Sequence, residues 1–320
     1  MAPTPNQPSA PKTDFDVIVL GAGPAGLTAG IYLGRARVSA IILDSGTIGG
    51  QTVLSYSVAN YPGVETSAGR DISQTMLRQA RAFGCEVKGY ARIARVDLTG
   101  ERKVVELVDG TRYTGRALIV ATGGIPRTLG LDSEERFAGK GISYCATCDG
   151  DFFTGRPIAV IGGGNSALEE SLTLTKYASK LTILHEFDHF QAQPWVIDEV
   201  TKNPKIELLM EQDVQRFEGE GTLERVVSVD KKTGKELAVA VDGCFVFIGY
   251  VPNTALFAKD LSLTERDEII TDEAMATTIP GVFAAGDVRQ KRTRQITTAV
   301  SDGTIAALSA TDFLTNATSR

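Results

Sequence analysis

Metal-binding side chains are scarce in this sequence of 320 residues. It has two histidines, His185 and His189, and four cysteines, of which only Cys145 and Cys148 are close together. A structural zinc site usually takes four ligands, either two cysteine pairs or one pair with spaced histidines. We therefore expect no metal site. The cysteines are also too few and too scattered for the disulfide framework of a secreted protein, so we expect a cytoplasmic protein.

Long apolar runs are absent as well, because no stretch approaches the ~20 residues that span a bilayer. The net charge of −6 and the pI near 5.2 argue against a nucleic-acid or anionic membrane surface. The segment 1–13 holds four prolines and no hydrophobic stretch, which predicts a disordered tail and not a signal peptide. The whole chain, with 42% hydrophobic residues and 33 glycines, is long enough for two globular domains.

The first of two glycine-rich segments follows the apolar run Phe15–Leu20, which predicts a β-strand. The motif GAGPAG at 21–26 comes directly after it, then a predicted helix over 27–34 and a second strand over 39–43, which ends at Asp44. In such a unit the first glycine makes the turn, the second admits a pyrophosphate, and the third lets the helix pack on the strand. An acid about 20 residues further on accepts a hydrogen bond from a ribose hydroxyl. The segment predicts a dinucleotide site.

A second copy of this pattern begins with the predicted strand Pro157–Ile161. It continues with GGGNSA at 162–167, a predicted helix over 168–176 and a strand over 180–184. Ala167 is the small residue that can replace the third glycine. We expect a second dinucleotide-type fold here, and the sequence leaves its ligand open.

The two copies predict an α/β chain with two Rossmann-like dinucleotide-binding domains, one inserted in the other. The breaker-rich segments Gly123–Pro126 and Gly249–Asn253 are the predicted crossovers. A late strand over 282–285 and a helix over 295–314 complete the first domain. The predicted parts are the tail at 1–13, a discontinuous first domain at 14–125 and 254–320, and an inserted domain at 126–253.

The segment CATCDG at 145–150 lies between the two glycine-rich turns. A Cys-x-x-Cys pair is the minimal dithiol/disulfide redox centre, and the motif tends to lower a thiol pKa. Asp149 could exchange a proton with the thiolate, although a turn or cap role before Gly150 is the alternative. Two dinucleotide folds that flank one disulfide suggest a flavin that exchanges electrons with a dithiol.

From about Phe15 to Leu314 the chain resembles the low-molecular-weight thioredoxin reductase family. The resemblance implies non-covalent FAD in the first domain, a homodimer, and a redox disulfide on an inserted NAD(P)H-binding-like domain. It also implies a domain rotation that brings the dithiol to the flavin in one state and to thioredoxin in the other. The matching motifs are GAGPAG at 21–26, GGQ at 49–51, NYPG at 60–63, CATCDG at 145–150, GGGNSALEE at 162–170, GD at 286–287 and RQ at 294–295.

The resemblance also implies roles for individual residues. Cys148 is expected nearer the flavin and Cys145 more exposed; Asp149 is the third expected catalytic residue, on the acid–base argument given above. Ile93 is expected to meet the adenine through its backbone. The expected FAD contacts are Gly21, Gly23, Ala25, Gly26, Asp44, Gly50, Gln51, Asn60, Ile93, Thr122, Gly123, Gly286, Asp287, Gln295 and Ile296.

The chain departs from the family at the second dinucleotide site. NADPH-using members end the second strand there with His-Arg-Arg-x-x-x-Arg, which binds the 2′-phosphate, whereas Glu186, Phe187 and Gln191 stand here in place of the arginines. A hydrogen bond to a charged group is worth ~1.5–3 kcal/mol, so the three losses would cost roughly 4–9 kcal/mol if they add. NADPH is therefore disfavoured. The residues expected at this site are Gly162, Gly164, Asn165, Ser166, His185, Glu186, Phe187 and Gln191.

Several electron donors remain open. Glu186 could mark an NADH enzyme, because an acid near this strand end can bind a ribose hydroxyl. Ferredoxin is another candidate, since the chain resembles the ferredoxin-dependent flavin thioredoxin reductases in lacking the clamp. Plant-type ferredoxin at about −400 mV and thioredoxin near −270 mV leave ~130 mV of driving force. The run Arg289–Arg294 would then offer a basic docking patch, although such runs are more often solvated loops.

The vacated site could instead hold a second planar cofactor, such as another flavin. Phe187 and Phe190 would stack on its ring, unless both belong to the core. Electron flow in the opposite direction would give a dithiol oxidase that uses dioxygen. A non-catalytic flavin-binding or redox-sensing protein is the alternative from another class, and the complete Cys145/Cys148 pair argues against it. The second site thus stays open between NADH, a second flavin and no ligand.

Overall fold

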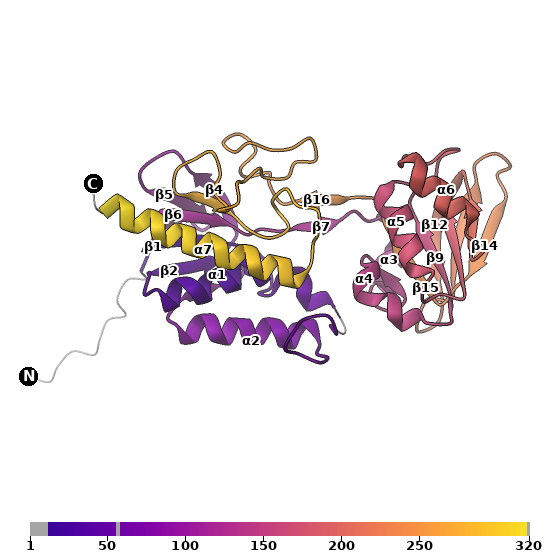
Figure 1. Cartoon of the computed structure of the whole chain (residues 1–320), viewed down its shortest axis with the longest axis horizontal. Coiled ribbons are helices and arrows are strands. Elements are labelled where there is room, and N and C mark those ends of the chain that lie inside the picture. Colours follow the sequence, from indigo (N-terminus) through magenta and orange to yellow (C-terminus); the bar gives the residue numbers. More distant parts are fainter. Residues whose placement is uncertain (1–11, 56–57, 319–320) are drawn as a thin grey trace, which may run out of the picture. The chain divides into compact units, whose positions relative to one another are not determined.

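The computed structural model describes residues 12–55 and 58–318 (Figure 1). Most of the tail expected at 1–13 therefore lies outside the described residues. The chain forms two compact units, the first made of Met1–Val53, Arg70–Gly124 and Pro252–Arg320, and the second of Leu54–Gly69 and Ile125–Val251. No helix within the described ranges is both long and apolar enough to cross a membrane.

The first unit has an α/β fold. Its elements are β1 (Asp14–Leu20), α1 (Pro24–Arg35), β2 (Ala40–Leu43), η1 (Gly50–Leu54), α2 (Gly69–Ala82), β3 (Glu86–Lys88), β4 (Ile93–Asp97), β5 (Lys103–Leu107), β6 (Arg112–Val120), β17 (Val282–Ala284) and α7 (Ile296–Thr318). The sheet order is β3-β2-β1-β6-β5-β4, and β17 also pairs with β6. The strands β3, β2, β1, β6 and β17 are parallel, whereas β5 and β4 form an antiparallel extension.

The helices α1 and α7 pack side by side in this unit (Figure 1). Their backbones approach closely, because a Cβ at Gly303 of α7 would lie 2.2 Å from the carbonyl oxygen of Ala25 in α1. Only glycine fits at such a distance. This contact brings the end of the chain back to the first glycine-rich turn.

The second unit has a parallel sheet and a small antiparallel one. Its elements, with the two connecting strands β7 and β16, are β7 (Gly124–Pro126), α3 (Asp132–Phe137), β8 (Ile142–Ser143), α4 (Ala146–Asp149), η2 (Gly150–Phe153), β9 (Pro157–Ile161), α5 (Asn165–Leu174), β10 (Lys180–Leu184), α6 (Pro194–Lys202), β11 (Ile206–Leu209), β12 (Gln212–Glu218), β13 (Arg225–Asp230), β14 (Glu236–Ala240), β15 (Gly243–Val246) and β16 (Tyr250–Pro252). The parallel sheet has the order β11-β10-β9-β15-β8, and the antiparallel sheet is β12-β13-β14.

The central strands of both sheets are buried. Val17–Leu20 in β1 and Ile158–Ile161 in β9 are at most 5% exposed, because helices and loops cover both faces of a parallel sheet. This explains why these strands read as continuous apolar runs. The predicted α/β class with two Rossmann-like folds is confirmed by the two strand–turn–helix units.

Both turn helices begin earlier than the sequence predicted. The helix α1 starts at Pro24 and α5 at Asn165, three residues before the predicted starts at 27 and 168. The reason is local, since the second glycine of each turn is already the extended N-cap residue. Proline is also favoured at the first helical position, where no backbone N–H is needed.

The connecting strands β7 and β16 pair with each other and lie within the segments predicted as crossovers. The segment Leu54–Gly69 belongs to the second unit, whereas the sequence placed it in the first domain. An antiparallel bridge between Val58 and Ser67 closes this segment on itself. Such a loop has no apolar periodicity, so the sequence cannot indicate to which unit it belongs.

Candidate functional site

The two cysteines of the CATCDG segment lie where β8, at the edge of the parallel sheet, leads into α4. The structure joins Cys145 and Cys148 in a disulfide with a Cα–Cα distance of 5.3 Å. Cys145 is the N-cap residue of α4, and its sulfur accepts a hydrogen bond from the backbone N–H of Cys148 at 3.2 Å. Both cysteines are partly exposed. The disulfide is therefore within reach of a reaction partner.

Asp149 is held by the hydroxyl of Ser143. Ser143 Oγ donates to Asp149 Oδ2 at 2.6 Å and accepts the backbone N–H of Cys145 at 3.1 Å. Burial raises the pKa of Asp149, the hydrogen bond from Ser143 lowers it, and the charge of Asp151 raises it. A carboxyl group with a raised pKa stays protonated closer to neutral pH, where it can donate a proton. No sequence motif pointed to Ser143, because its contact with Asp149 depends on where β8 ends.

A second hydrogen bond restrains the same segment. Tyr144 Oη donates to Glu134 Oε1 at 2.9 Å. Glu134 is buried, and its other oxygen accepts the N–H groups of Leu129 and Gly130 at 2.8 and 3.1 Å. A buried carboxylate needs such donors, and here they tie the residue before Cys145 to the start of α3.

The first glycine-rich turn is shaped by two different glycine requirements. Gly21 has a φ of +106°, and a Cβ there would lie 2.2 Å from the carbonyl oxygen of Ala121. Gly23 has an ordinary φ, and a Cβ there would meet only the Cα of Gly50, at 3.9 Å. Gly21 thus serves the fold, whereas Gly23 leaves open space at the N-terminus of α1. Backbone N–H groups at such a terminus suit a phosphate.

Asp44 closes the other side of this turn. Its Oδ2 accepts the N–H of Ala22 at 2.6 Å and its Oδ1 accepts the N–H of Gly46 at 2.7 Å. Each carboxylate oxygen has a second lone pair, so the group can also accept a hydrogen bond from a ribose hydroxyl. The structure thus brings Asp44 to the turn that contains Gly21 and Gly23.

The GD motif lies beside the same helix. A Cβ at Gly286 would be 2.9 Å from that of Ala25, and Asp302 of α7 accepts the N–H of Gly286 at 3.0 Å. Burial raises the pKa of Asp287, and the charge of Lys291 opposes this. In the described chain, Asp287 Oδ1 is buried without a hydrogen-bond partner. Such an oxygen is costly unless a ligand donates to it, so this site fits a group rich in hydroxyls, as FAD is.

Thr122 and Gly123, which follow β6, make contacts within the protein. Thr122 Oγ1 donates to the carbonyl oxygen of Asn253 at 2.8 Å, and Asn253 Nδ2 donates to the carbonyl oxygen of Thr122 at 2.9 Å. The N–H of Asn253 also donates to the carbonyl oxygen of Gly123 at 2.9 Å. The Thr122 hydroxyl therefore binds the segment that follows β16.

The remaining predicted FAD contacts are spread over the chain. In the first unit, Gln51 is exposed in η1 and Ile93 begins β4. Gln295 directly precedes α7, and Ile296 is its first residue. Asn60 lies in the segment 54–69, which belongs to the second unit. The structure therefore groups most of the predicted contacts in one unit, with Asn60 as the exception.

The second glycine-rich turn has the same backbone shape as the first. Gly162 has a φ of +136°, and a Cβ there would lie 2.4 Å from the carbonyl oxygen of Phe247. A Cβ at Gly164 would meet only the carbonyl oxygen of Gln191, at 3.9 Å. The N–H of Gln191 donates to the carbonyl oxygen of Gly163 at 2.9 Å. The loop that follows β10 therefore runs along this turn.

Asn165 and Ser166 begin the helix of the second turn. Asn165 Oδ1 accepts the N–H of Gln193 at 2.7 Å, while Ser166 is exposed. The Asn165 side chain thus fixes the far end of the loop. The hydroxyl of Ser166 stays accessible beside the helix N-terminus.

His185 stands where this unit has the counterpart of Asp44. It is 3% exposed, its Nε2 lies 3.0 Å from the carbonyl oxygen of His189, and its ring stacks on Phe190. A Cβ at Gly163 would be 2.4 Å from the ring. Burial lowers the pKa of His185, so the ring is neutral near pH 7 and adds no positive charge. Phe190 packs against the buried core of this unit, which supports the core interpretation for this residue.

The three positions that lack arginine are exposed. Glu186, Phe187 and Gln191 all lie at the surface of the loop. Lys231 approaches Glu186 at 3.9 Å and lies 5.6 Å from the centre of the Phe187 ring. An exposed ion pair of this kind contributes at most ~1 kcal/mol. The segment 185–191 therefore carries none of the family's three arginines, and the lysine that approaches it, Lys231, follows β13 and is already paired.

The basic run Arg289–Arg294, expected to be either a docking patch or a solvated loop, is only partly exposed. Lys291 is 8% exposed and pairs with Asp302 at 2.7 Å. Arg294 pairs with Glu268. These ion pairs direct the charges of Lys291 and Arg294 toward the protein, whereas Arg292 is exposed.

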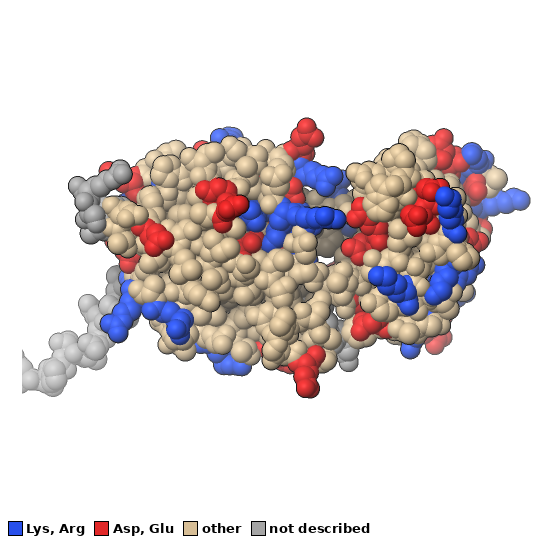
Figure 2. Space-filling view, in the orientation of Figure 1, with Lys and Arg blue, Asp and Glu red and all other residues tan. Residues whose placement is uncertain are grey.

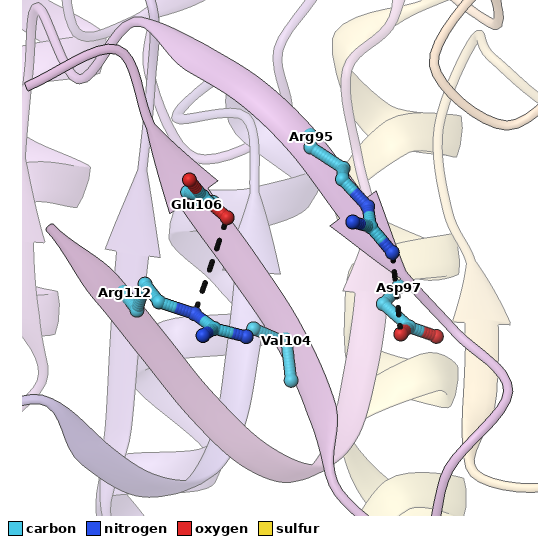
Figure 3. Close-up of a pocket in the computed structure, with 5 residues that line it drawn as sticks. All are labelled: Arg95, Asp97, Val104, Glu106 and Arg112. Carbon is cyan, nitrogen blue, oxygen red and sulfur yellow. Dashed lines mark ion pairs between the residues drawn. The ribbon is translucent and has the colours of Figure 1, made fainter. Parts of the chain in front are cut away.

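A small surface pocket is lined by residues that are not among the predicted site residues (Figure 3). It encloses about 20 Å³ on the antiparallel extension of the first sheet, enough for about one water molecule. Figure 3 shows its charged side chains in two ion pairs, Arg95 with Asp97 at 3.7 Å and Arg112 with Glu106 at 4.0 Å. The pocket is too small and too well neutralised for a cofactor.

The chain is similar to known proteins over nearly its full length. The sequence model of one protein family, described as pyridine nucleotide-disulphide oxidoreductase, matches residues 15–303. A thioredoxin reductase of Listeria innocua is 43% identical and covers 94% of either chain. A 34.2 kDa protein in the rubredoxin operon of Clostridium pasteurianum is 42% identical and covers 95% of this chain and 98% of its own. The crystal structure of thioredoxin reductase from Streptococcus pyogenes is 36% identical, has a TM-score of 0.91, and covers 95% of this chain and 99% of that one.

Proposed function

Because the chain belongs to the pyridine nucleotide-disulphide oxidoreductase family, we propose that it reduces the disulfide of a thioredoxin-type protein through Cys145 and Cys148. The predicted resemblance to low-molecular-weight thioredoxin reductases is confirmed, and so is the class of enzyme, a FAD-dependent disulfide oxidoreductase. The observation that carries the proposal is the partly exposed disulfide beside a carboxyl group whose pKa is raised.

The residues of the first unit fit FAD. Gly23 and Gly50 leave space for a pyrophosphate, Asp44 can accept a hydrogen bond from a ribose, and Asp287 has a buried oxygen that lacks a donor in the described chain. Bound FAD supplies a carrier that accepts electrons singly or in pairs and passes a pair to a disulfide. We propose that the other predicted contacts, with Gln51, Ile93 and Ile296 among them, complete this site.

The dithiol chemistry can be written in two steps. Reduction of the Cys145–Cys148 disulfide takes up one electron pair and two protons and yields two thiols, and Asp149 supplies one of these protons. The Cys145 thiolate then attacks the partner disulfide to form a mixed disulfide, and the Cys148 thiolate attacks Cys145 to release the partner as a dithiol. The N–H of Cys148, 3.2 Å from Cys145 Sγ, favours the thiolate of Cys145 because it donates to the charged form.

A pyridine nucleotide is the first candidate for the electron donor. The family description names this cofactor class, and relatives named thioredoxin reductase support the same role. The second glycine-rich turn has the open space at Gly164 that a pyrophosphate needs. No arginine binds a 2′-phosphate at this site, because Glu186, Phe187 and Gln191 stand at the three positions. The site should therefore not distinguish NADPH from NADH.

A donor other than a pyridine nucleotide is the second candidate, and the missing arginines favour it. Ferredoxin remains energetically suitable, but the ion pairs of Lys291 and Arg294 weaken the docking patch first considered for it. A second flavin would find Phe187 exposed, 40% of its surface being accessible, whereas Phe190 is part of the core packing. A dithiol oxidase that uses dioxygen would run the same two steps in reverse.

We also propose a homodimer in the cytoplasm. Figure 2 shows that the face over α1 and α7 carries few charged side chains. Tyr32 of α1 and Leu308 of α7 are 38% and 50% exposed. A face with few charges and with exposed apolar side chains is typical of an interface between subunits.

The decisive experiment is anaerobic reduction of the holoenzyme with NADPH, NADH and reduced ferredoxin in separate assays, followed by addition of oxidised thioredoxin. The proposal predicts that at least one donor bleaches the flavin and that thioredoxin restores its colour. A reduced holoenzyme that no thioredoxin reoxidises would overturn the proposal. Bleaching by NADPH alone, with NADH inactive, would overturn the expected lack of phosphate discrimination.

A further inference from the structure

The buried hydroxyl of Ser143 links the proposed proton donor to the backbone of the dithiol segment. Ser143 is the last residue of β8 and is 6% exposed. Its position is fixed because β8 pairs with β15 through Phe245. Strand pairing therefore places this hydroxyl between Asp149 and Cys145, six and two residues further along the chain.

We propose that Ser143 is a positioning residue for Asp149, which holds the carboxyl group against the Cys145 segment and sets the pH at which it releases its proton. The inference rests on the proposed disulfide reduction and adds to it a residue that determines its pH dependence.

The hydrogen-bond directions support this role. The backbone N–H of Cys145 can only donate, so it occupies one lone pair of Ser143 Oγ, at 3.1 Å. The hydroxyl proton is then available for Asp149 Oδ2 at 2.6 Å, a length typical of hydrogen bonds to an ionised carboxylate. Ser143 thus stabilises the charged form of Asp149.

The charged surroundings of Asp149 act in the opposite sense. Burial and the charge of Asp151 on η2 raise its pKa, and the hydrogen bond from Ser143 lowers it. The helix α5, which packs against α4, carries two more acids, Glu169 and Glu170, and burial raises the pKa of Glu170. Removal of the Ser143 hydroxyl should therefore shift the protonation of Asp149 to higher pH.

The test is the rate at which a small dithiol, dithiothreitol, reduces the Cys145–Cys148 disulfide of the holoenzyme between pH 4.5 and 8. Alkylation and mass measurement count the new thiols. Each rate is divided by that of Asp149→Asn at the same pH, which cancels the titration of the reagent. Ser143→Ala should move the midpoint of this ratio up by about one pH unit, a tenfold change in proton affinity, and Ser143→Thr should restore it.

Tyr144→Phe is the matched control, because it removes the hydrogen bond of the neighbouring residue to Glu134 and should leave the midpoint where it is. An unchanged midpoint in Ser143→Ala, an equal shift in Tyr144→Phe, or loss of fold and FAD in Ser143→Ala would each overturn the inference. Failure of the proposed function differs from these outcomes. In that case the reduced cysteines of the wild-type protein would not exchange electrons with FAD at any pH.

Discussion

The two glycine-rich turns have nearly the same backbone and different surroundings. In each, the first glycine has a positive φ, and a Cβ on it would collide with a carbonyl oxygen, that of Ala121 near Gly21 and that of Phe247 near Gly162. In each, the second glycine is the N-cap of the helix and has open space around it. The glycines therefore give both turns the same open space at the helix N-terminus.

The difference lies at the end of the second strand of each unit. Asp44 accepts hydrogen bonds from the first turn and can also accept one from a ribose. His185 instead packs its neutral ring against Gly163, and Glu186 follows it in place of an arginine. The glycine pattern is thus common to both units, whereas the residues after the second strand differ, and we propose that they determine which nucleotide binds.

Replacement of the second glycine should have the largest effect and should affect the two turns differently. Gly23→Val should fold, because its backbone is extended and its surroundings are open, but the side chain should fill the pyrophosphate space. We expect a colourless protein that does not retain FAD. The matched variant Gly164→Val should stay yellow. Absorbance of the purified proteins checks both, and retention of FAD by Gly23→Val would refute the assignment of the first turn.

Introduction of the family's three arginines into the second unit should raise its affinity for NADPH. The triple variant Glu186→Arg, Phe187→Arg and Gln191→Arg places charges at three exposed positions. If each contributes ~1.5–3 kcal/mol and the contributions add, NADPH should bind about three to six powers of ten more tightly. The affinity for NADH, measured by the same fluorescence titration, is the control. An equal gain for both nucleotides would mean that the 2′-phosphate does not reach these positions.

Asp149→Asn should slow disulfide exchange by about 10²–10⁴-fold, the usual contribution of general acid–base catalysis. Burial raises the pKa of Asp149, so the wild-type rate of the proton-dependent step should fall as pH rises through that pKa. The asparagine variant should lack this dependence. Rates within a few-fold of wild type, with the fold intact, would mean that Asp149 is a turn residue and not a proton donor.

Asp44→Asn should have the smallest effect. It removes the charge that accepts the N–H groups of Ala22 and Gly46, and a charged hydrogen bond is worth ~1.5–3 kcal/mol. We expect FAD to bind about 10- to 100-fold more weakly, as measured by equilibrium dialysis. His185→Asn, at the corresponding place in the second unit, should leave the FAD affinity unchanged. A similar loss in both variants would indicate a general effect on stability.

Elements with a local sequence signal could be predicted, whereas contacts that depend on the pairing of distant elements could not. The strands at 157–161 and 180–184 were predicted with the bounds that the structure has, because apolar runs and glycine turns are local signals. The contact of Ser143 with Asp149 depends on the pairing of an edge strand, and no spacing rule reveals it. The ion pair of Lys291 could not be predicted for the same reason, since its partner Asp302 lies on α7.

The central claim is that the protein holds two redox groups, FAD and the Cys145–Cys148 disulfide, and a reductive titration counts them directly. Under anaerobic conditions the wild-type holoenzyme should take up two electron pairs per FAD, one for the flavin and one for the disulfide. Cys148→Ser should take up one pair, and Cys85→Ala, which removes a buried free cysteine, should still take up two. One pair in the wild-type protein, or two pairs in Cys148→Ser, would contradict the account.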